Sequence, residues 1–350
     1  MLDTPIANRI HIGFFGRMNA GKSTLVNEFC GQNLAIVSPT PGTTTDPVSK
    51  AMEILPLGPC LITDTAGIDD EGELGAQRVA KTMAVLEKTD IAVWVGENPT
   101  ITHPHLIEYH RGDSVEELKK KIAAIKLDEE PGLLEGLVKA GDKVTLVCPI
   151  DGSAPKGRLI LPQVQVLREC LDRHVIATVC QPSELDLTNP PELIITDSQA
   201  FNEVDSKIRK FENSKISLTS FSILFARQKG DLEEFKKGLE AVKNLKDGDT
   251  ILIAEGCTHH RQCNDIGSVK IPKAVEKLSG KKLNLVFASG ADFPQFENSQ
   301  FANSKIALVI HCGGCMLTRR MMLARIARCK AAGVPIVNYG ILLQEVLCAK

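Results

Sequence analysis

The chain has 350 residues, which is enough for two or three domains that each bury a core. Lys and Arg number 41 against 43 Asp and Glu, so the formal net charge is −2, and 4% of the residues are aromatic. Because nucleic-acid binding usually needs a basic excess or a stacking surface, this composition argues against RNA or DNA as a partner. No apolar run approaches the roughly 18 residues of a membrane span, and the start shows no secretory signal.

Cysteine usage indicates the compartment. The sequence contains 11 cysteines, an odd number. In a long chain without a secretory signal, such a count favours free thiols or metal ligands over a disulfide framework. We therefore expect a cytoplasmic protein that neither enters nor crosses a membrane.

The first predicted elements are a strand at Ile10–Phe15, a glycine-rich turn and a helix at Thr24–Cys30. The turn reads Gly16-Arg17-Met18-Asn19-Ala20-Gly21-Lys22-Ser23, which is the spacing of a P-loop. In a P-loop, backbone N–H groups surround the nucleotide phosphates, the lysine neutralises their charge, and the serine reaches Mg²⁺. The residues expected to bind nucleotide and cations here are Gly16, Asn19, Ala20, Gly21, Lys22, Ser23 and Thr24.

Two more motifs follow at the distances that a nucleotide site needs. Asp64-Thr65-Ala66-Gly67 comes after a predicted strand at Cys60–Thr63, where the carboxylate can hold Mg²⁺ through water and the Gly67 N–H can face a γ-phosphate. Between the two motifs lies Pro41-Gly42-Thr43-Thr44-Thr45-Asp46, where a threonine can close over Mg²⁺. A plain polar loop is the alternative for this threonine run.

These three motifs resemble the translation-factor-related GTPases, especially the branch with Asn in the P-loop and a Gly-Thr-Thr switch. The resemblance implies that GTP, Mg²⁺ and K⁺ bind, with Asn19 and Thr43 beside K⁺ and Thr44 on Mg²⁺. In this family K⁺ can do the work of an arginine finger. The resemblance assigns the catalytic roles to Lys22, Thr44, Asp64 and Gly67.

The residue after Gly67 departs from Ras-type enzymes, since Ile68 stands where they carry a catalytic Gln. We therefore expect slow intrinsic GTP hydrolysis that K⁺ stimulates. Glu71 and Glu73 are candidates for orienting the attacking water, and solvated loop charge is the alternative for both.

A base-reading motif of the form Asn-Lys-x-Asp is absent from the sequence. The segment from Val95 to the predicted helix at Glu116–Ile125 is expected to be too short for the usual helix, strand and base-reading loop. This departure leaves open how guanine is selected.

A charged stretch that ends in Pro131-Gly132 marks the first domain boundary. We expect a P-loop GTPase domain over residues 1–128, a small α/β dimerisation domain over 131–208, and a parallel-sheet α/β domain over 209–350. Alternating strands and helices predict that both faces of the last sheet are covered and that ligands bind beyond the carboxyl ends of its strands. Its predicted strands are 220–225, 250–254, 283–288, 305–310 and 335–339.

Cysteine and histidine residues follow two strands of the last domain. Cys257-Thr258-His259 comes after one predicted strand, and His311-Cys312-Gly313-Gly314-Cys315 comes after another. Carboxyl ends of parallel strands meet at one edge, so a single pocket can collect these side chains. The thiolates of Cys257, Cys312 and Cys315 suit an iron–sulfur cluster, which normally takes four Cys ligands, and they also suit Zn²⁺ with three Cys and one His. His259 and His311 are the candidate additional ligands.

Cys-x-His followed by His-Cys-x-x-Cys, behind a GTPase domain, resembles the GTPase family that matures [FeFe]-hydrogenase. Val147-Cys148-Pro149-Ile150-Asp151 and the stretch 154–165 extend the resemblance over nearly the whole chain. It implies a homodimer with a 4Fe–4S cluster on Cys257, Cys312 and Cys315 and a labile fourth position. It further implies a scaffold or carrier for the two-iron H-cluster precursor, with radical-SAM maturation enzymes and apo-hydrogenase as partners and GTP shifting partner contacts.

Three other functions remain open at this point. A GTP-dependent zinc metallochaperone or regulator would use the same ligands for a different metal. An RNA-modification-type GTPase would fit the N-terminal motifs, although the charge balance disfavours it. A structural dimer with a degenerate P-loop would show no nucleotide turnover.

Overall fold

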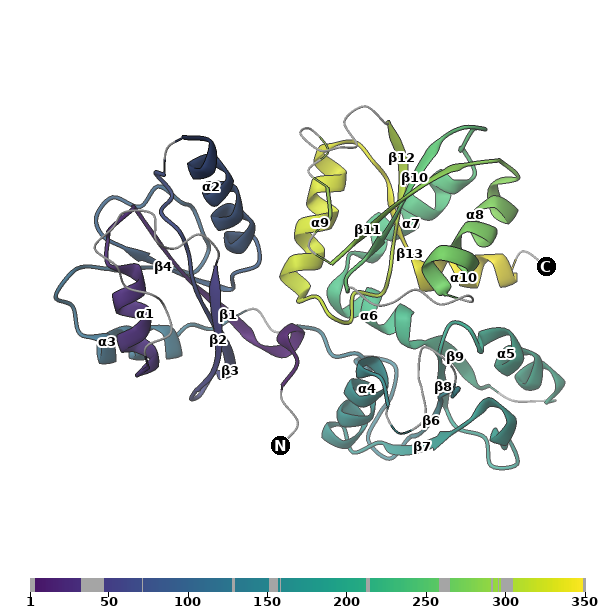
Figure 1. The fold of residues 1–350 in the computed structure, drawn as a ribbon. Coiled ribbons are helices and arrows are strands. Elements are labelled where there is room, and N and C mark those ends of the chain that lie inside the picture. The colour runs from purple at the N-terminus through teal and green to yellow at the C-terminus, as the bar shows by residue number, and fades with distance from the viewer. Residues whose placement is uncertain are drawn as a thin grey trace. The chain divides into compact units, whose positions relative to one another are not determined.

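The computed structural model describes residues 4–32, 47–70, 72–127, 130–150, 157, 159–211, 215–257, 265–290, 292–294, 296 and 305–348. Two compact units make up the chain, residues 1–129 and residues 130–350 (Figure 1). No helix among the described residues is long and apolar enough to cross a membrane.

The first unit is a five-stranded sheet in the order β2-β3-β1-β4-β5 with helices on both faces. All neighbouring pairs are parallel except β2 with β3. Its elements are η1 (Ile6–Asn8), β1 (Ile10–Gly16), α1 (Lys22–Cys30), β2 (Val48–Ile54), β3 (Gly58–Asp64), α2 (Gly72–Leu86), β4 (Ile91–Val95), β5 (Leu106–Tyr109) and α3 (Val115–Ala123).

Adjacent phenylalanines of β1 supply the two cores of this unit. Phe14 packs with Phe29 of α1 and Leu118 of α3, whereas Phe15 packs with Trp94 on the other face of the sheet. Successive side chains of a strand point to opposite faces, so one apolar run serves both. This double coverage explains why β1 reads as a continuous hydrophobic run.

The segment after Val95, expected to be too short for the usual helix, strand and base-reading loop, does contain a strand. Strand β5 pairs in parallel with β4, from Ala92 opposite Leu106 to Val95 opposite Tyr109. The connection over residues 96–105 contains no helix, which is how a short segment still reaches the sheet. Only two side chains of β5, Ile107 and Tyr109, are buried, so the strand left a weak hydrophobic signal.

The second unit contains two sheets. The middle sheet has the order β7-β6-β8-β9, and all of its strands are parallel. Its elements are β6 (Lys143–Val147), α4 (Leu161–Asp172), β7 (Ile176–Cys180), η2 (Pro182–Glu184), β8 (Leu193–Thr196), α5 (Phe201–Lys210), β9 (Ser217–Ser220) and α6 (Phe221–Lys229). Strand β9 therefore extends the middle sheet beyond residue 208, the end expected for the dimerisation domain.

The predicted strand at 220–225 is wrong, because residues 221–229 form helix α6. The Ser220 side chain caps this helix by accepting a hydrogen bond from the backbone N–H of Ile223. Phe221, Leu224 and Phe225 are buried at helical spacing in the middle core. A short apolar run has no periodicity that separates a strand from a buried helix, which accounts for the error.

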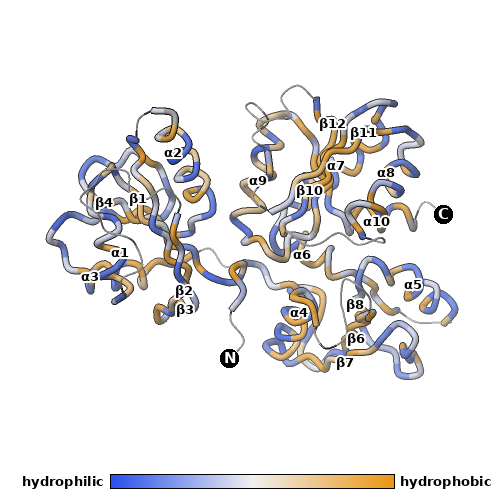
Figure 2. The backbone as a smooth tube through the Cα atoms, viewed as in Figure 1, coloured by the Kyte–Doolittle hydropathy of each residue, from blue (hydrophilic) through white to orange (hydrophobic). Residues whose placement is uncertain are grey.

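The third sheet has the order β11-β10-β12-β13 and is parallel throughout. Its elements are α7 (Leu232–Val242), β10 (Thr250–Glu255), η3 (Ile266–Lys270), α8 (Ile271–Ser279), β11 (Asn284–Ser289), β12 (Ile306–His311), α9 (Arg319–Ala331), β13 (Ile336–Asn338) and α10 (Tyr339–Cys348). Helix α9 covers one face, and α8 and α10 cover the other (Figure 1). The strands of this sheet are more hydrophobic than the helices around them, as Figure 2 shows. The expected α/β class with a covered parallel sheet is confirmed.

Candidate functional site

The P-loop lies between β1 and α1, so its backbone faces the N-terminus of a helix. Gly21 has φ 91°, a left-handed conformation that glycine adopts without strain, and Lys22 begins the helix directly after it. Asn19 also has a positive φ of 60°. Ala20 lies between Asn19 and Gly21, and Thr24 lies in the first turn of α1, so the predicted phosphate-binding residues run from the end of β1 into the helix.

The Lys22 side chain is buried inside this loop. Its Nζ atom donates hydrogen bonds to the carbonyl oxygens of Gly16, at 3.2 Å, and Arg17, at 2.7 Å. Burial lowers the pKa of Lys22, and the nearby Asp64 and Asp69 carboxylates oppose that effect. A buried ammonium beside helix N–H groups makes the loop a site for an anion, as the motif predicts.

Asp64 and Ser23 form a polar pair that fits Mg²⁺. The Ser23 hydroxyl donates to Oδ2 of Asp64 at 2.6 Å. The other carboxylate oxygen, Oδ1, is buried and has no hydrogen-bond partner among the described residues. Burial raises the pKa of Asp64, whereas Ser23 and Lys22 lower it. A carboxylate oxygen without a hydrogen-bond partner, next to a hydroxyl, supplies the oxygen ligands that a hard cation such as Mg²⁺ prefers.

The segment after Asp64 is docked on the P-loop. The backbone N–H of Ile68 donates to the Gly16 carbonyl at 3.2 Å. A Cβ atom on Gly67 would lie 2.7 Å from the Met18 backbone nitrogen, so only glycine fits this approach. Oδ1 of Asp69 accepts a hydrogen bond from that same nitrogen at 2.6 Å. Sequence reasoning missed Asp69, because a carboxylate five residues after Asp64 gives no local sign of contacting the P-loop.

Four predicted residues of this site cannot be placed. Thr43, Thr44 and Glu71 lie outside the described residues, and the side chain of Glu73 does as well. Their assigned roles remain predictions.

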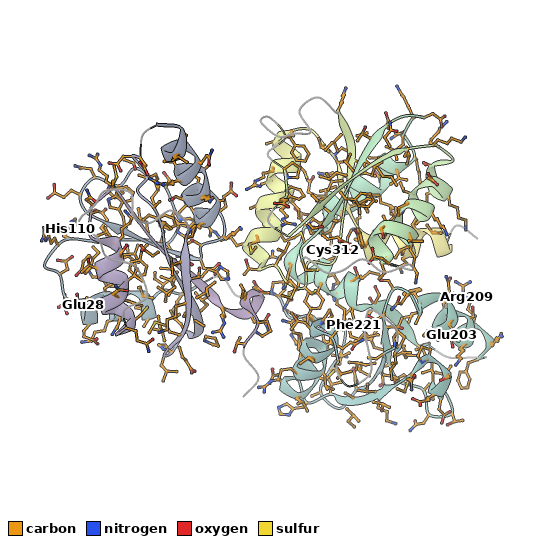
Figure 3. The ribbon with its side chains drawn as sticks, in the orientation of Figure 1. Glu28, His110, Glu203, Arg209, Phe221 and Cys312 are labelled. Carbon is orange, nitrogen blue, oxygen red and sulfur yellow. The ribbon has the colours of Figure 1, made fainter. Side chains whose placement is uncertain are left out.

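The three cysteines of the C-terminal motifs gather at the carboxyl ends of β10 and β12. Cys312 directly follows β12, and its sulfur accepts hydrogen bonds from the backbone N–H groups of Gly256, at 3.1 Å, and Gly314, at 3.4 Å. Figure 3 labels Cys312 at this end of the third sheet. Gly314 has φ 68°, and this left-handed residue turns the chain back towards Cys315.

These thiols interact with one another. Burial, together with the nearby Cys315 and Cys257, raises the pKa of Cys312 to about 12, although the N–H groups of Gly256 and Gly314 lower it. Burial likewise raises the pKa of Cys257 to about 11, with Cys315 as the next cause. Three sulfurs that resist joint ionisation need a bound cation to become thiolates together, so the donor chemistry fits a metal cluster. Among the described residues, no group of three or more His, Cys, Asp or Glu side chains is arranged so that it could hold a metal ion.

His311 is fully buried and uses both of its ring nitrogens. Nε2 lies 2.8 Å from Nη1 of Arg325, and Nδ1 lies 2.8 Å from the carbonyl oxygen of Cys312. Arginine only donates, so Nε2 accepts and the Nδ1–H donates to Cys312. Burial, followed by the Arg325 charge, lowers the pKa of His311 to about 3. Neither nitrogen is available as a ligand in this arrangement, and His259 lies outside the described residues.

Three family models match this chain in succession. Residues 11–131 match the 50S ribosome-binding GTPase domain, residues 133–230 the hydrogen maturase F dimerization domain, and residues 233–348 the hydrogen maturase F tetramerization domain. The chain belongs to the hydrogen maturase F family. The resemblance to the maturation GTPases of [FeFe]-hydrogenase is thereby confirmed, and the chain carries two domains of oligomerisation type behind its GTPase domain.

Individual relatives match only part of the chain. GTPase Der of Wolinella succinogenes is 42% identical over 91 residues, which cover 25% of this chain and 19% of the relative. The tRNA modification GTPase MnmE of Zymomonas mobilis is 29% identical over 139 residues, covering 37% of this chain and 32% of the relative. The chain thus spans under a third of the length of these relatives. A structure of Era from Aquifex aeolicus with GDP and aluminium fluoride is 15% identical, with a TM-score of 0.23, over 81% of this chain and 94% of that one.

Proposed function

We propose that this protein is a GTP-hydrolysing scaffold or carrier that assembles or delivers the two-iron precursor of the [FeFe]-hydrogenase H-cluster. The observation that carries the proposal is the convergence of Cys257, Cys312 and Cys315 at one sheet edge, within a domain matched by the hydrogen maturase F family. Radical-SAM maturation enzymes would supply the precursor, and apo-hydrogenase would receive it. We place the process in the cytoplasm, where thiols stay reduced.

Nucleotide binding would use the P-loop residues described above. Lys22 would neutralise the β- and γ-phosphates, and Ser23 with Asp64 would hold Mg²⁺. Thr44 would complete the Mg²⁺ site, with Asn19 and Thr43 beside K⁺. Ile68 cannot orient a water molecule, so intrinsic hydrolysis would be slow and K⁺ would stimulate it.

Guanine selection would fall to Asp113, in the loop that follows β5. This loop and the P-loop follow parallel strands and so leave the sheet at the same edge. It is held by two hydrogen bonds, from the His110 backbone N–H to Oδ2 of Asp113 and from the Tyr109 hydroxyl to the Asp113 carbonyl, both 2.8 Å long. His110 lies on the same side of the unit as Glu28 of α1 in Figure 3. A carboxylate accepts from the N–H donors on the Watson–Crick edge of guanine, whereas adenine presents an acceptor there.

The cluster site would hold a 4Fe–4S group through Cys257, Cys312 and Cys315. Bound there, such a group would supply an exchangeable fourth iron position for cargo. The protein would contribute the three thiolates and the N–H groups of Gly256 and Gly314 that donate to Cys312. Because His311 is fixed by Arg325, the fourth position would remain open to an exchangeable ligand.

Pairing of two copies would involve the middle domain. Edge strand β7 exposes Ile176 by 57% and Val179 by 44%, and nearby in the fold α4 exposes Leu171 by 65%. An edge strand with apolar exposed side chains is a ready surface for another chain. Changes in the GTPase domain would alter partner contacts through its switch loops.

Metal analysis with electron paramagnetic resonance (EPR) tests the cluster assignment. Wild type, Cys312→Ala and a control, Cys180→Ala, are reconstituted anaerobically and analysed for iron, sulfide and zinc. About four irons per chain and a reduced-cluster signal lost only in Cys312→Ala support the proposal. About one zinc without iron would overturn it in favour of a zinc metallochaperone or regulator, which the same thiols favour as the second candidate.

A further inference from the structure

Lys229 is a buried cation at the end of helix α6. Its side chain is 2% exposed, and lysine is rarely buried to this extent unless it has an interaction partner. Its Nζ atom donates to the carbonyl oxygens of Leu317, at 2.6 Å, and Cys315, at 3.4 Å. The ring of Phe225, one turn earlier on α6, lies 5.2 Å from the same atom. Lys229 therefore holds the chain directly after the second cysteine of the Cys-x-x-Cys turn.

The segment from Cys312 to Leu317, called the cysteine turn below, runs alongside α6 over the length of the helix. Near the start of α6, a Cβ on Gly313 would lie 3.2 Å from the Ser222 hydroxyl, so the turn packs closely there. At the other end of the helix, Lys229 binds the turn at Leu317. The two contacts fix both ends of the segment that contains Cys315.

The carbonyl groups that receive Lys229 are neutral, so they satisfy its N–H groups without cancelling its charge. The negative groups that act on Lys229 are Glu130 and, when ionised, Cys315 and Cys312. A 4Fe–4S core bound by three thiolates is a net anion, and one-electron reduction makes it more negative. Net charge and hydrogen bonding around the sulfurs are among the factors that set the reduction potential of such clusters.

We infer that Lys229 is a positioning residue of the cluster site, which fixes the turn at Cys315 and compensates the negative charge of the thiolates and of the group they hold. This inference rests on the proposed cluster function. If Lys229 only donated hydrogen bonds to the two carbonyl groups, an uncharged donor of similar length would hold the turn equally well. The charge and the hydrogen bonds can therefore be separated by substitution.

The test compares four variants of the full chain after anaerobic reconstitution. Lys229→Met removes charge and donors, Lys229→Gln keeps donors without charge, and Lys229→Arg keeps the charge. Lys236→Met, on the exposed surface of α7, is the matched control. Iron per chain and the thermal unfolding of the apoprotein are measured first. The midpoint potential of the cluster is then measured by EPR-monitored titration with dithionite.

We expect Lys229→Met and Lys229→Gln to shift the midpoint potential to more negative values. Lys229→Arg and Lys236→Met should stay near wild type. A cluster-loaded Lys229→Gln with the wild-type potential would overturn the inference while leaving the cluster function intact. Should Lys229→Met fail to fold, Lys229→Gln decides, because its amide can still donate to a carbonyl. A wild-type chain that takes up no iron would overturn both.

Discussion

The carboxylate of Asp69 accepts a hydrogen bond from the backbone nitrogen of Met18 at 2.6 Å, which ties the segment after the Asp64 motif to the P-loop. The same carboxylate acts on the buried ammonium of Lys22. A negative group therefore lies beside a loop whose motif is typical of phosphate binding. Nucleotide binding has to overcome this like charge or displace it.

Asp69→Asn should tighten GTP binding. Removing one exposed charge beside the phosphates is worth up to ~1 kcal/mol, which corresponds to up to about fivefold in Kd. The measurement is a fluorescence titration with a labelled GTP analogue, and Glu53→Gln on β2 is the control carboxylate. Unchanged or weaker affinity in Asp69→Asn would show that the contact does not oppose the nucleotide.

Asp113→Asn should change base preference. The amide replaces an acceptor with a donor, so GTP affinity should fall at least about tenfold, as expected for a lost charge-assisted hydrogen bond of ~1.5 kcal/mol or more. Xanthosine triphosphate carries a carbonyl in place of the 2-amino group of guanine and should gain affinity. Competition binding with both nucleotides checks this, with Glu108→Gln on β5 as the control. Equal loss for both nucleotides would argue for a folding defect in the loop.

Asp64→Asn should abolish Mg²⁺-dependent hydrolysis. A bound divalent cation supplies several kcal/mol of charge stabilisation, so the rate should fall by at least ~100-fold. Phosphate release at saturating Mg²⁺ measures it, and raising the Mg²⁺ concentration should not restore the rate. Wild-type turnover in this variant would place the cation on other residues.

Acid should destabilise the apoprotein through His311. Its folded pKa is about 3 against about 6.5 in the unfolded chain, so the unfolded state binds more protons between those pH values. Stability is therefore highest above pH 6.5 and falls as the pH drops towards 3, by roughly 3 kcal/mol between pH 6.5 and 4. Urea unfolding across this range should show the slope in wild type and a flatter one in His311→Gln. Parallel slopes would assign the acid sensitivity to other groups.

Much of the nucleotide site follows from local sequence. The P-loop residues from Gly16 to Ser23 are contiguous, and Asp64 follows an apolar strand, so spacing alone is enough to predict their roles. Asp69 and Lys229 could not be predicted in this way, because each acts on a residue far away in the sequence. Lys229 in particular follows an apolar run that was interpreted as a strand, and only tertiary packing places its side chain at the cysteine turn.

The sequence predicts the candidate ligands of the cysteine site but not the residues that surround them. Cys257, Cys312 and Cys315 follow strand ends, which the βα alternation indicates. That His311 is engaged by Arg325 depends on helix α9 crossing the end of β12, a relationship that no local pattern encodes. Sequence reasoning therefore gave His311 as a candidate ligand at the end of a strand, but could not identify Arg325 as its partner.

Helix α6 contributes side chains to two hydrophobic cores, that of the middle sheet and that of the third sheet. Phe221, Leu224 and Phe225 are part of the middle core, Ala226 is part of the core of the third sheet, and Lys229 reaches the cysteine turn. A fragment beginning at residue 231 would match the tetramerization model yet lack the helix that supports its cysteines. The cysteine site therefore depends on a helix that is also part of the core of the middle sheet.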